Sequence, residues 1–234
     1  MARIVVISGA SRGLGIQMAK RYLELGDTVY AGARNPECSQ LRELKEEYPE
    51  KLVCVAMDVT STPSVNTAAA QVAEKSAYVD ILVNNAATHS GPPDDILEMV
   101  DIDSCRRIYD VNCLGSLRTV KALLPLLRAA KGAKIANISS EAGSIGACWR
   151  TAGFDYCMSK SGMNMGTKLL SNYLKDDGVH VISIHPGWLR TDMGGPKADL
   201  DPYEAAATLV DLIESSNLGD SELFLNYTGE ELPW

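Results

Sequence analysis

Short, continuously apolar runs alternate with amphipathic helical stretches along the 234-residue chain. Strands with one face in water alternate apolar and polar side chains, whereas strands covered by helices on both faces of a parallel sheet are apolar throughout. The runs in this chain are of the second kind, so the pattern favours a doubly wound α/β sheet. The predicted strands are residues 3–8, 28–33, 51–57, 80–84, 133–139, 179–185 and 222–226.

The predicted helices lie between these strands, at residues 14–25, 39–48, 61–77, 103–130 and 154–175. Gly26 suits the position just past a helix C-terminus, and Pro49 follows the second helix. Pro125 lies inside the fourth helix, where we expect a bend or break. Because no linker or low-complexity segment interrupts the pattern, we expect a single-domain Rossmann fold over residues 1–234. Its sheet would be seven-stranded and mostly parallel, with helices on both faces.

The formal net charge of −8 disfavours binding to nucleic acid, because the phosphate groups would be repelled. The longest apolar runs, such as residues 123–127, fall far short of the roughly 20 residues that a membrane-spanning helix needs. The N-terminus enters an apolar run without a small-residue cleavage site, so no signal peptide is expected. The 6 cysteines form no Cys-x-x-Cys pair and there are only 3 histidines, which indicates buried free thiols and no metal site. We therefore expect a cytoplasmic protein that binds neither nucleic acid nor membrane.

The first predicted strand runs directly into a glycine-rich turn, and a helix follows at once. A nucleotide diphosphate needs a tight turn, backbone N–H groups that no Cβ shields, and the positive end of a helix. Gly9, Gly13 and Gly15 are placed to supply these. A glycine triplet alone is a weak signal, but its position between a strand and a helix predicts dinucleotide binding.

The end of the second predicted strand indicates which nicotinamide coenzyme is bound. An acidic residue there would accept hydrogen bonds from the ribose 2′-hydroxyl and repel a 2′-phosphate. This chain instead has Arg34 just beyond residues 30–33, and Arg12 in the glycine turn is a second cation on the same side. Two guanidinium groups favour NADP(H) over NAD(H), although Arg34 could equally be a solvated loop charge.

These motifs, with others further along the chain, resemble those of the short-chain dehydrogenase/reductase superfamily, and they occur in the order found there. The resemblance covers nearly the whole chain. Residues 185–196 and 229–234 resemble more narrowly the C-factor/sniffer-type carbonyl reductases, which implies a fold and an activity but not a cellular role. The motifs are the Gly9–Gly13–Gly15 turn, Asn84-Asn85-Ala86-Ala87, Ser139-Ser140, Tyr156-x-x-x-Lys160, and His185-Pro186-Gly187 followed by Thr191.

The chemistry of Tyr156 and Lys160 can be argued from their spacing. One helical turn separates them, so both side chains share a face. An ammonium within about 4–6 Å favours the phenolate, so we expect the pKa of Tyr156 to fall from its ordinary value near 10. Tyr156 could then donate a proton to a carbonyl oxygen or remove one from an alcohol. The resemblance implies that Lys160 also binds the nicotinamide ribose.

Ser140 would hydrogen-bond the substrate oxygen and stabilise the developing alkoxide, with Ser139 as a competing candidate. Ser140 is preferred because residues 141–146 resemble the stretch after the family's catalytic serine. The separation between Ser140 and Tyr156 is a few residues longer than is common in the family, which leaves the shape of the intervening loop open. Asn112 matches the fourth catalytic residue, whose main-chain carbonyl anchors a water leading to Lys160.

The resemblance also implies the coenzyme contacts. Asp58 would accept from the adenine amino group, Asn85 and Ala86 would line the adenine ribose, and Thr191 would bind the carboxamide or the phosphates. Ser8 and Ala87 depart from the family, which usually has Thr and Gly there. The full expected coenzyme set is Gly9, Ser11, Arg12, Gly13, Leu14, Gly15, Arg34, Asp58, Val59, Asn85, Ala86, Ala87, Tyr156, Lys160, Pro186, Gly187, Trp188, Leu189 and Thr191.

Substrate recognition is expected from loops at the carboxyl ends of the strands. Besides Ser140, the candidates are His89, Trp149 and Trp188, whose indoles would suit an apolar ketone but could equally be core or interface aromatics. The predicted function is NADP(H)-dependent hydride transfer to or from a carbonyl or secondary alcohol. A coenzyme-binding signalling or sensor protein of the same fold is the alternative. The resemblance also implies a homodimer or homotetramer.

Overall fold

The computed structural model describes residues 2–89, 96–221 and 223–234. Its strands form one sheet in the order β3-β2-β1-β4-β5-β6-β7, and every neighbouring pair is parallel. The predicted α/β fold class is therefore confirmed. The first six strands begin and end within one residue of their predicted bounds, whereas residue 222 of the seventh lies outside the described residues. The strands are β1 (Ile4–Ser8), β2 (Thr28–Ala33), β3 (Leu52–Ala56), β4 (Ile81–Asn84), β5 (Lys134–Ile138), β6 (His180–His185) and β7 (Phe224–Asn226).

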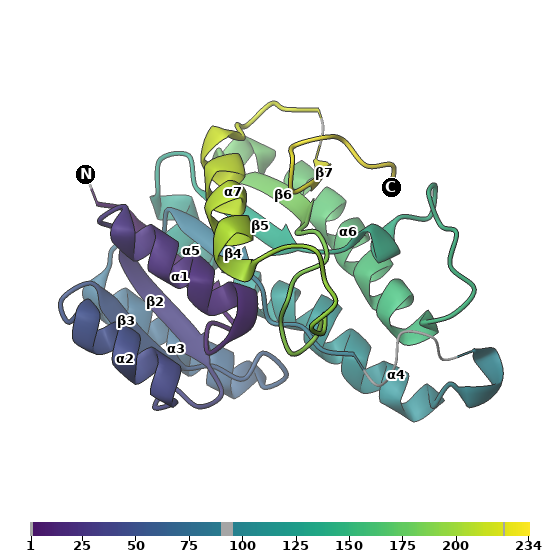
Figure 1. Ribbon diagram of the computed structural model, residues 1–234. Coiled ribbons are helices and arrows are strands. Elements are labelled where there is room, and N and C mark those ends of the chain that lie inside the picture. The colour runs from purple at the N-terminus through teal and green to yellow at the C-terminus, as the bar shows by residue number, and fades with distance from the viewer. Residues whose placement is uncertain (1, 90–95, 222) are drawn as a thin grey trace.

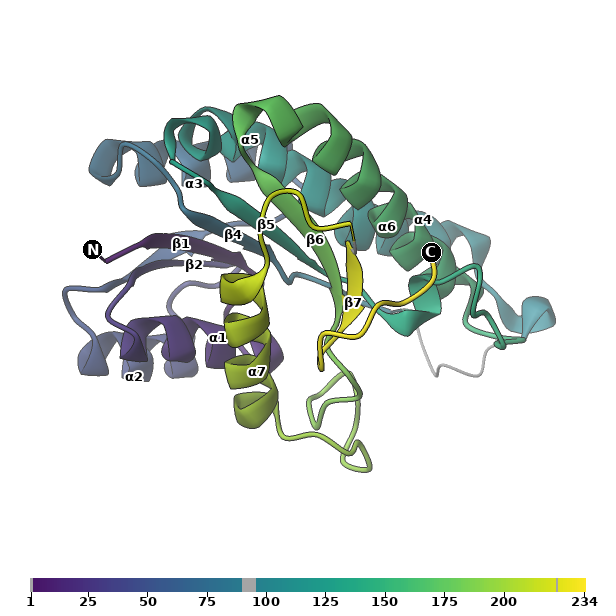
Figure 2. The same ribbon diagram turned by 90° about the horizontal axis from the view of Figure 1, so that it is seen from above.

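Helices cover both faces of the sheet, which gives three layers (Figure 1). The view from above shows α1, α2 and α7 on one face, and α3, α5 and α6 on the other with α4 beside α6 (Figure 2). The helices are α1 (Gly13–Glu24), α2 (Ser39–Glu47), α3 (Thr62–Lys75), α4 (Ile102–Tyr109), α5 (Gly115–Ala129), α6 (Phe154–Leu174) and α7 (Pro202–Ser215).

The sheet separates two apolar cores, which explains why its strands are apolar throughout. On β1, Val5 and Ile7 pack into the core beneath α1, α2 and α7, whereas Val6 packs into the core beneath α3 and α5. All three side chains are fully buried. Since successive residues of a strand point to opposite faces, a strand between two helical layers needs an apolar side chain at every position.

The helix is not broken at Pro125, so the break allowed for there is wrong. Helix α5 runs through Pro125 to Ala129, and the helical geometry changes instead at η2 (Asp110–Leu114), a π-helical segment between α4 and α5. Proline removes one helical hydrogen bond. Its neighbours Leu123 and Leu127 are fully buried against the sheet, and this packing holds the helix together across that position.

Helix α7 was not predicted from the sequence, although its signals are present. Asp201 caps its N-terminus by accepting from the Tyr203 amide, and Pro202 follows at the first helical position. Leu209 and Ile213, spaced for a helix, are fully buried against α1 and the sheet. This helix completes the layer over β6 and β7.

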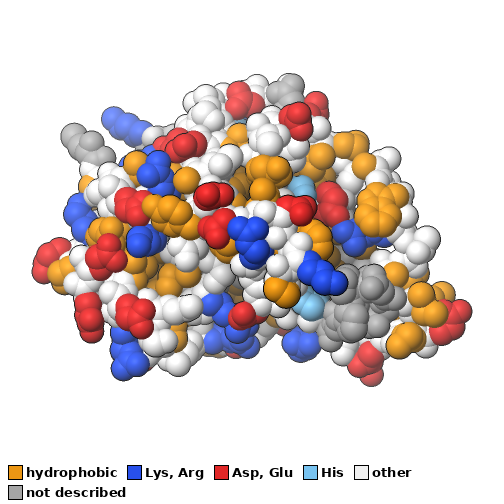
Figure 3. All heavy atoms as spheres, in the orientation of Figure 1, with side chains coloured by type: hydrophobic (Ala, Val, Ile, Leu, Met, Phe, Trp, Pro, Cys, Tyr) orange, Lys and Arg blue, Asp and Glu red, His pale blue; other side chains and the backbone are white. Residues whose placement is uncertain are grey.

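The surface is mixed in charge, and none of the described helices is long and apolar enough to cross a membrane. Acidic and basic side chains are interspersed over the face shown in Figure 3. All six cysteines lie in the described part of the chain and are free thiols, but the expectation that they are buried holds only for Cys113, since Cys148 is exposed and the other four are partly buried.

Candidate active site

One large cavity of about 820 Å³ lies along the carboxyl ends of the strands. The residues that line it come from the glycine turn after β1, the segments after β2, β3 and β4, helix α6 and the segment after β6. The order of the sheet reverses between β1 and β4, and in open α/β sheets the ligand binds beside such a reversal. The cavity has the place and the length expected for an extended dinucleotide.

The glycine turn forms a cradle that other residues would block. Gly9 has φ of +68°, and a Cβ there would lie 2.7 Å from the Cα of Ala86. A Cβ at Gly15 would lie 2.3 Å from the Gly9 carbonyl oxygen and 2.4 Å from the Asn85 side chain. The turn therefore packs directly against the segment after β4 and leads at once into α1, the arrangement that a bound diphosphate requires.

The segment after β4 is fastened to this turn by hydrogen bonds. The Ser8 hydroxyl accepts from the amides of Asn85 and Ala86, each at 3.2 Å. The Asn85 side-chain amide donates to the carbonyl oxygen of Gly9 at 3.0 Å. Ser8 thus provides the hydroxyl that holds these two loops together, in place of the threonine usual in the family.

The end of the cavity beside β2 and β3 carries cations and one carboxylate. Arg34 is exposed and lines the cavity, as does Arg12 of the glycine turn. Arg12 also forms a 3.2 Å ion pair with Asp192. Hydrogen bonds from the amide and hydroxyl of Thr60 lower the pKa of Asp58 from its ordinary value, so Asp58 is a carboxylate acceptor at neutral pH.

Tyr156 and Lys160 lie one turn apart on α6, and both line the same cavity. The Lys160 ammonium lies 5.5 Å from the centre of the Tyr156 ring and donates a 2.7 Å hydrogen bond to the carbonyl oxygen of Ile138. Lys160 is fully buried, whereas Tyr156 is partly buried. The predicted sharing of one helix face by these side chains is present in the structure.

The expected fall in the pKa of Tyr156 is wrong for this structure. Burial raises the pKa of Tyr156 to about 12, and the hydrogen bond with Ser140 only partly opposes it. Burial lowers the pKa of Lys160 to about 7, so this ammonium is itself easily discharged. The cost of burying the two groups outweighs the attraction between them.

The two candidate serines differ in what their hydroxyls contact. Ser139 lines the cavity, but its hydroxyl donates to the Asn164 side chain at 2.7 Å. Ser140 hydrogen-bonds Tyr156 and donates to the Glu141 carboxylate at 2.5 Å. Both serines are buried. Of the two, Ser140 is the one beside the phenol.

Asn112 lies in the π-helical segment η2 and is fully buried, so it is not a helix-surface residue. Its side chain accepts from the Thr88 amide at 2.8 Å and donates to the Thr88 carbonyl oxygen and the Ser159 hydroxyl, each at 2.9 Å. These bonds connect the segment after β4 to helix α6 one residue before Lys160.

The cavity brings together most of the coenzyme residues expected from the sequence, but several expected residues are not among those lining it. Trp149 is 75% exposed, and the indole of Trp188 donates to the Gly194 carbonyl oxygen, so neither is a core residue. His89 is partly buried and borders the segment outside the described residues. The expected residues that line the cavity are Gly9, Ser11, Arg12, Gly13, Leu14, Arg34, Asp58, Val59, Asn85, Ala86, Ala87, Tyr156, Lys160, Pro186, Leu189 and Thr191; Gly15, His89, Asn112, Ser140, Trp149, Gly187 and Trp188 do not.

Sequence reasoning missed several residues of the site. Arg107 and Val111 line the cavity from α4 and η2, and their spacing of four along one helical stretch was a usable signal. Glu141 and Arg150 form an ion pair beside Ser140. No sequence signal pairs these two, because the eight residues between them follow no regular period.

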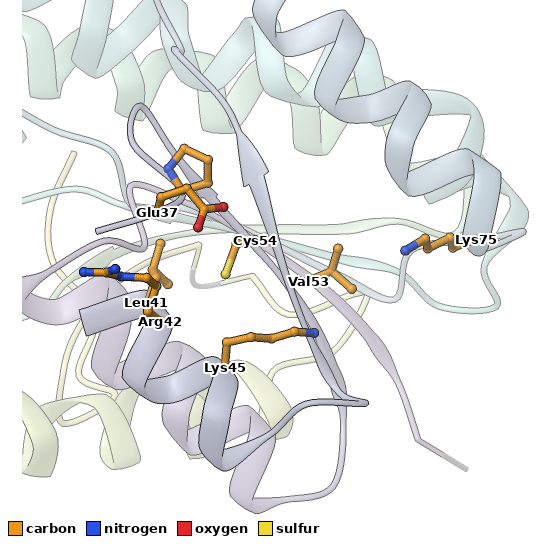
Figure 4. A pocket seen from close by; sticks show the side chains of 8 residues that line it. Glu37, Leu41, Arg42, Lys45, Val53, Cys54 and Lys75 are labelled. Carbon is orange, nitrogen blue, oxygen red and sulfur yellow. The ribbon is translucent and has the colours of Figure 1, made fainter. Parts of the chain in front are cut away.

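A second, smaller cavity of about 260 Å³ lies away from this cleft, between α2, β3 and the end of α3 (Figure 4). Its side chains include Glu37, Arg42, Cys54 and Lys75. The ammonium of Lys45 beside it donates to the carbonyl oxygens of Pro49 and Leu52. This cation therefore ties the loop after α2 to β3, and the large cleft remains the candidate active site.

Comparison with known proteins agrees with this geometry. The family model described as short chain dehydrogenase matches residues 3–201, and the chain belongs to the short-chain dehydrogenase/reductase superfamily. It is an oxidoreductase of that family, in the subgroup that resembles C-signal and the sniffer-type carbonyl reductases.

One relative and two solved structures illustrate the similarity. C-signal of Myxococcus xanthus is 36% identical over 156 residues, which cover 67% of this chain and 93% of that protein. The carbonyl reductase Sniffer of D. melanogaster has a TM-score of 0.93 at 27% identity, with all of both chains covered. An NADPH-bound carbonyl reductase from chicken fatty liver has a TM-score of 0.91 at 30% identity, covering 100% of this chain and 99% of that one.

Proposed function

We propose that this protein is an NADPH-dependent carbonyl reductase in which Tyr156 donates a proton to the substrate oxygen. The observation that carries the proposal is that Tyr156 and Lys160 line the same cavity as the glycine turn. A group bound by the turn and extended along the cleft would reach the phenol. The carbonyl reductases among the structural neighbours support the same reaction.

The residues around the cleft fit a nicotinamide dinucleotide. The cradle at Gly9 and Gly15, which a Cβ would fill, suits a diphosphate, and the Asp58 carboxylate suits the adenine amino group. When bound, the coenzyme supplies the hydride. The residues proposed to hold it are Gly9, Ser11, Arg12, Gly13, Leu14, Gly15, Arg34, Asp58, Val59, Asn85, Ala86, Ala87, Tyr156, Lys160, Pro186, Gly187, Trp188, Leu189 and Thr191.

NADP(H) is proposed over NAD(H) because of the two arginines at the β2 end. Arg34 and Arg12 both line the cavity where a 2′-phosphate would lie, and no acidic residue ends β2. Charge-assisted bonds from guanidinium groups favour a phosphate over a hydroxyl. The chicken carbonyl reductase is NADPH-bound, which supports the same choice.

The raised pKa of Tyr156 favours reduction. With a pKa of about 12, Tyr156 is a phenol at neutral pH, which is the form that can donate a proton to a carbonyl oxygen. Ser140 would donate a hydrogen bond to the same oxygen, and Lys160 would orient the ribose and stabilise the phenolate left behind. Asn112 would anchor the route by which that phenolate regains its proton.

The test is oxidation of NADPH against a panel of ketones and aldehydes. We expect turnover with at least one apolar carbonyl compound, and Tyr156→Phe should lower kcat by about 100-fold or more while leaving NADPH binding intact. Tyr173→Phe, an exposed tyrosine further along α6, is the matched control. Tyr156→Phe with undiminished turnover would refute the assignment.

Binding of NADPH without turnover on the whole panel would instead support a coenzyme-binding signalling protein of this fold. The name of the C-signal relative is what favours that alternative. The substrate contacts proposed for the reductase are Ser140, His89, Trp149 and Trp188, with no metal involved.

We also propose that the protein is a homodimer or homotetramer that acts in the cytoplasm, where its free thiols would stay reduced. Large apolar side chains at helical spacing are exposed along α6, beside others on α4, η2 and α5. Burying such a stripe against a second copy would remove it from water. Leu169→Glu should yield a monomer by light scattering; an unchanged mass would exclude this face. The exposed residues are Tyr109, Leu114, Leu117, Met158, Met165, Leu169 and Tyr173.

A further inference from the structure

The loop between Ser140 and Tyr156 is longer than is common in the family. Arg150 of this loop forms an ion pair with Glu141, the residue next to Ser140. The Ser140 hydroxyl donates to Oε2 of Glu141 at 2.5 Å, and the same oxygen accepts from the Ala142 amide at 2.9 Å. The other carboxylate oxygen of Glu141 is paired with the guanidinium of Arg150. A carboxylate thus contacts the serine directly, and the loop supplies its counter-charge.

Arg150 is held at this position from both sides. Its guanidinium carbon lies 5.1 Å from the centre of the Trp149 ring, and its side chain is 27% exposed. Glu141, with a side chain 34% exposed, also lies 3.7 Å from Nδ1 of His185, the residue that precedes the Pro186-Gly187 segment. The ion pair therefore joins the substrate-side loop, the catalytic serine and the end of β6.

We propose that Glu141 is a positioning residue for the Ser140 hydroxyl, and that Arg150 neutralises Glu141 beside Tyr156, so that this ion pair sets the acid strength of the phenol. The inference rests on the proposed role of Tyr156 as the proton donor. It adds to that role a reason why the loop before Tyr156 belongs to the catalytic machinery.

The first part follows from counting protons. Ser140 has one hydroxyl proton, for which the Glu141 carboxylate and the Tyr156 oxygen compete, and its 2.5 Å contact is to Glu141. A substrate carbonyl must therefore compete with a carboxylate for that proton. Hydrogen bonds to ionised acceptors are roughly twice as strong as hydrogen bonds between neutral groups. The ion pair with Arg150 weakens Glu141 as an acceptor, and this decides how well the substrate carbonyl competes for the Ser140 proton.

The second part follows from the charges around the phenol. Burial raises the pKa of Tyr156, the Ser140 bond lowers it, Glu141 raises it and Arg150 lowers it. Other titratable groups near the pair include Cys148 in the loop, Cys157 and Lys160 on α6, and His185, which faces Glu141 from β6. Burial would raise the pKa of Glu141, but its bonds to Ser140 and Arg150 and the nearby His185 hold it below its ordinary value. Glu141 is therefore charged at neutral pH.

The test compares two substitutions that each remove one charge of the pair and keep a polar side chain. Glu141→Gln removes a negative charge beside Tyr156. In a plot of kcat/KM for alcohol oxidation against pH, it should move the limb that reports the ionisation of Tyr156 to lower pH. Arg150→Gln removes the positive charge and should move the same limb to higher pH. Each shift should be about one pH unit, as expected for a charge several ångströms away in a partly exposed site. Arg150→Lys keeps the charge and should restore the profile of the parent enzyme.

The matched controls are Arg128→Gln and Asp177→Asn, which break an exposed ion pair of 2.9 Å between α5 and the segment after α6. Neither should move the limb. A purely structural role for Glu141 and Arg150 would lower the rates of both variants without moving the limb, or would move it the same way in both. Either result would overturn the proposal.

A second readout does not depend on turnover. The 13Cζ chemical shift of labelled tyrosine, assigned through Tyr156→Phe, reports the titration of the phenol in the protein alone. At the highest pH at which the fold persists, the phenolate fraction should be larger in Glu141→Gln and smaller in Arg150→Gln than in the parent. If the phenolate fractions differ as stated but Tyr156→Phe remains active, the proposed function fails and the ion-pair inference stands. If Tyr156→Phe is inactive and the phenolate fractions are equal, the proposed function stands and the ion-pair inference fails.

Discussion

The ammonium of Lys160 donates a 2.7 Å hydrogen bond to the main-chain carbonyl of Ile138, the last residue of β5. This bond joins α6 to the carboxyl end of β5, where the cleft opens. Lys160 is 1% exposed, and burial lowers its pKa from 10.5 to about 7. A lysine in such a place lowers the stability of the fold whenever it is charged.

Stability should therefore rise with pH above neutrality. Between about pH 7 and about pH 10.5 the unfolded chain keeps the Lys160 proton while the folded protein has lost it, so the free energy of unfolding increases by up to about 1.4 kcal/mol per pH unit. Lys160→Met should remove this slope and be more stable than the parent at and below neutral pH. Urea unfolding across this range measures it, with the exposed Lys168→Met on the same helix as control. Equal slopes in parent and Lys160→Met would contradict the prediction.

Coenzyme preference should depend on Arg34. Arg34→Asp replaces a cation that lines the β2 end of the cleft with an acid, which would repel a 2′-phosphate and accept from a ribose hydroxyl. We expect the Kd for NADPH to rise by about 10- to 100-fold while that for NADH stays level or falls. Fluorescence titration with both coenzymes measures the ratio. Arg42→Asp, an exposed arginine on α2 outside the cleft, should leave the ratio unchanged; equal losses for both coenzymes in Arg34→Asp would refute the assignment.

The ion pair between Arg12 and Asp192 should compete with coenzyme binding. Both side chains are largely exposed, and Arg12 cannot interact at full strength with Asp192 and with a coenzyme phosphate at the same time. Asp192→Asn should therefore tighten NADPH binding a few-fold, less so at high salt, with a smaller effect on NADH. Asp211→Asn, which removes an exposed acid on α7, is the control for net charge. Weaker binding in Asp192→Asn would show that the pair closes over the coenzyme rather than competing with it.

The cradle should not tolerate a methyl group at Gly15. In Gly15→Ala the new Cβ would lie 2.3 Å from the Gly9 carbonyl oxygen, so either the turn or the start of α1 must move. We expect the loss of measurable NADPH binding and a destabilisation of about 2–4 kcal/mol. Gly166→Ala is the control, because a Cβ there meets open space and alanine suits a helix interior. A Gly15→Ala variant with unchanged affinity would mean that the diphosphate does not bind at this turn.

Most of the fold could be predicted from local sequence patterns. The runs at 28–33 and 179–185 were recognisable as buried strands because a strand between two helical layers is apolar at every position. The glycine turn was recognisable because the requirements of a diphosphate are themselves local. Tyr156 and Lys160 could be placed on one face of a helix because the period of a helix is fixed.

Other features depended on groups that are distant in the sequence. The helical run at 103–130 is interrupted by the π-helical segment Asp110–Leu114 and continues unbroken through Pro125, where Leu123 and Leu127 are buried against the sheet. The sequence favours Ser140 over Ser139 only through the resemblance of residues 141–146, whereas the fold places Asn164 beside Ser139 and Tyr156 beside Ser140.

The chain by itself determined the order of its strands, the glycine turn after the first of them and the placing of a phenol and an ammonium on one helix face, since each of these follows from spacing along a strand, turn or helix. Only the tertiary structure decided the charge states at the site, because burial moves the pKa of Tyr156 up and that of Lys160 down. Likewise, only folding brings Arg150 against Glu141 beside the serine. The cost of removing a charge from water depends on everything packed around it, and that environment is assembled from segments far apart in the chain.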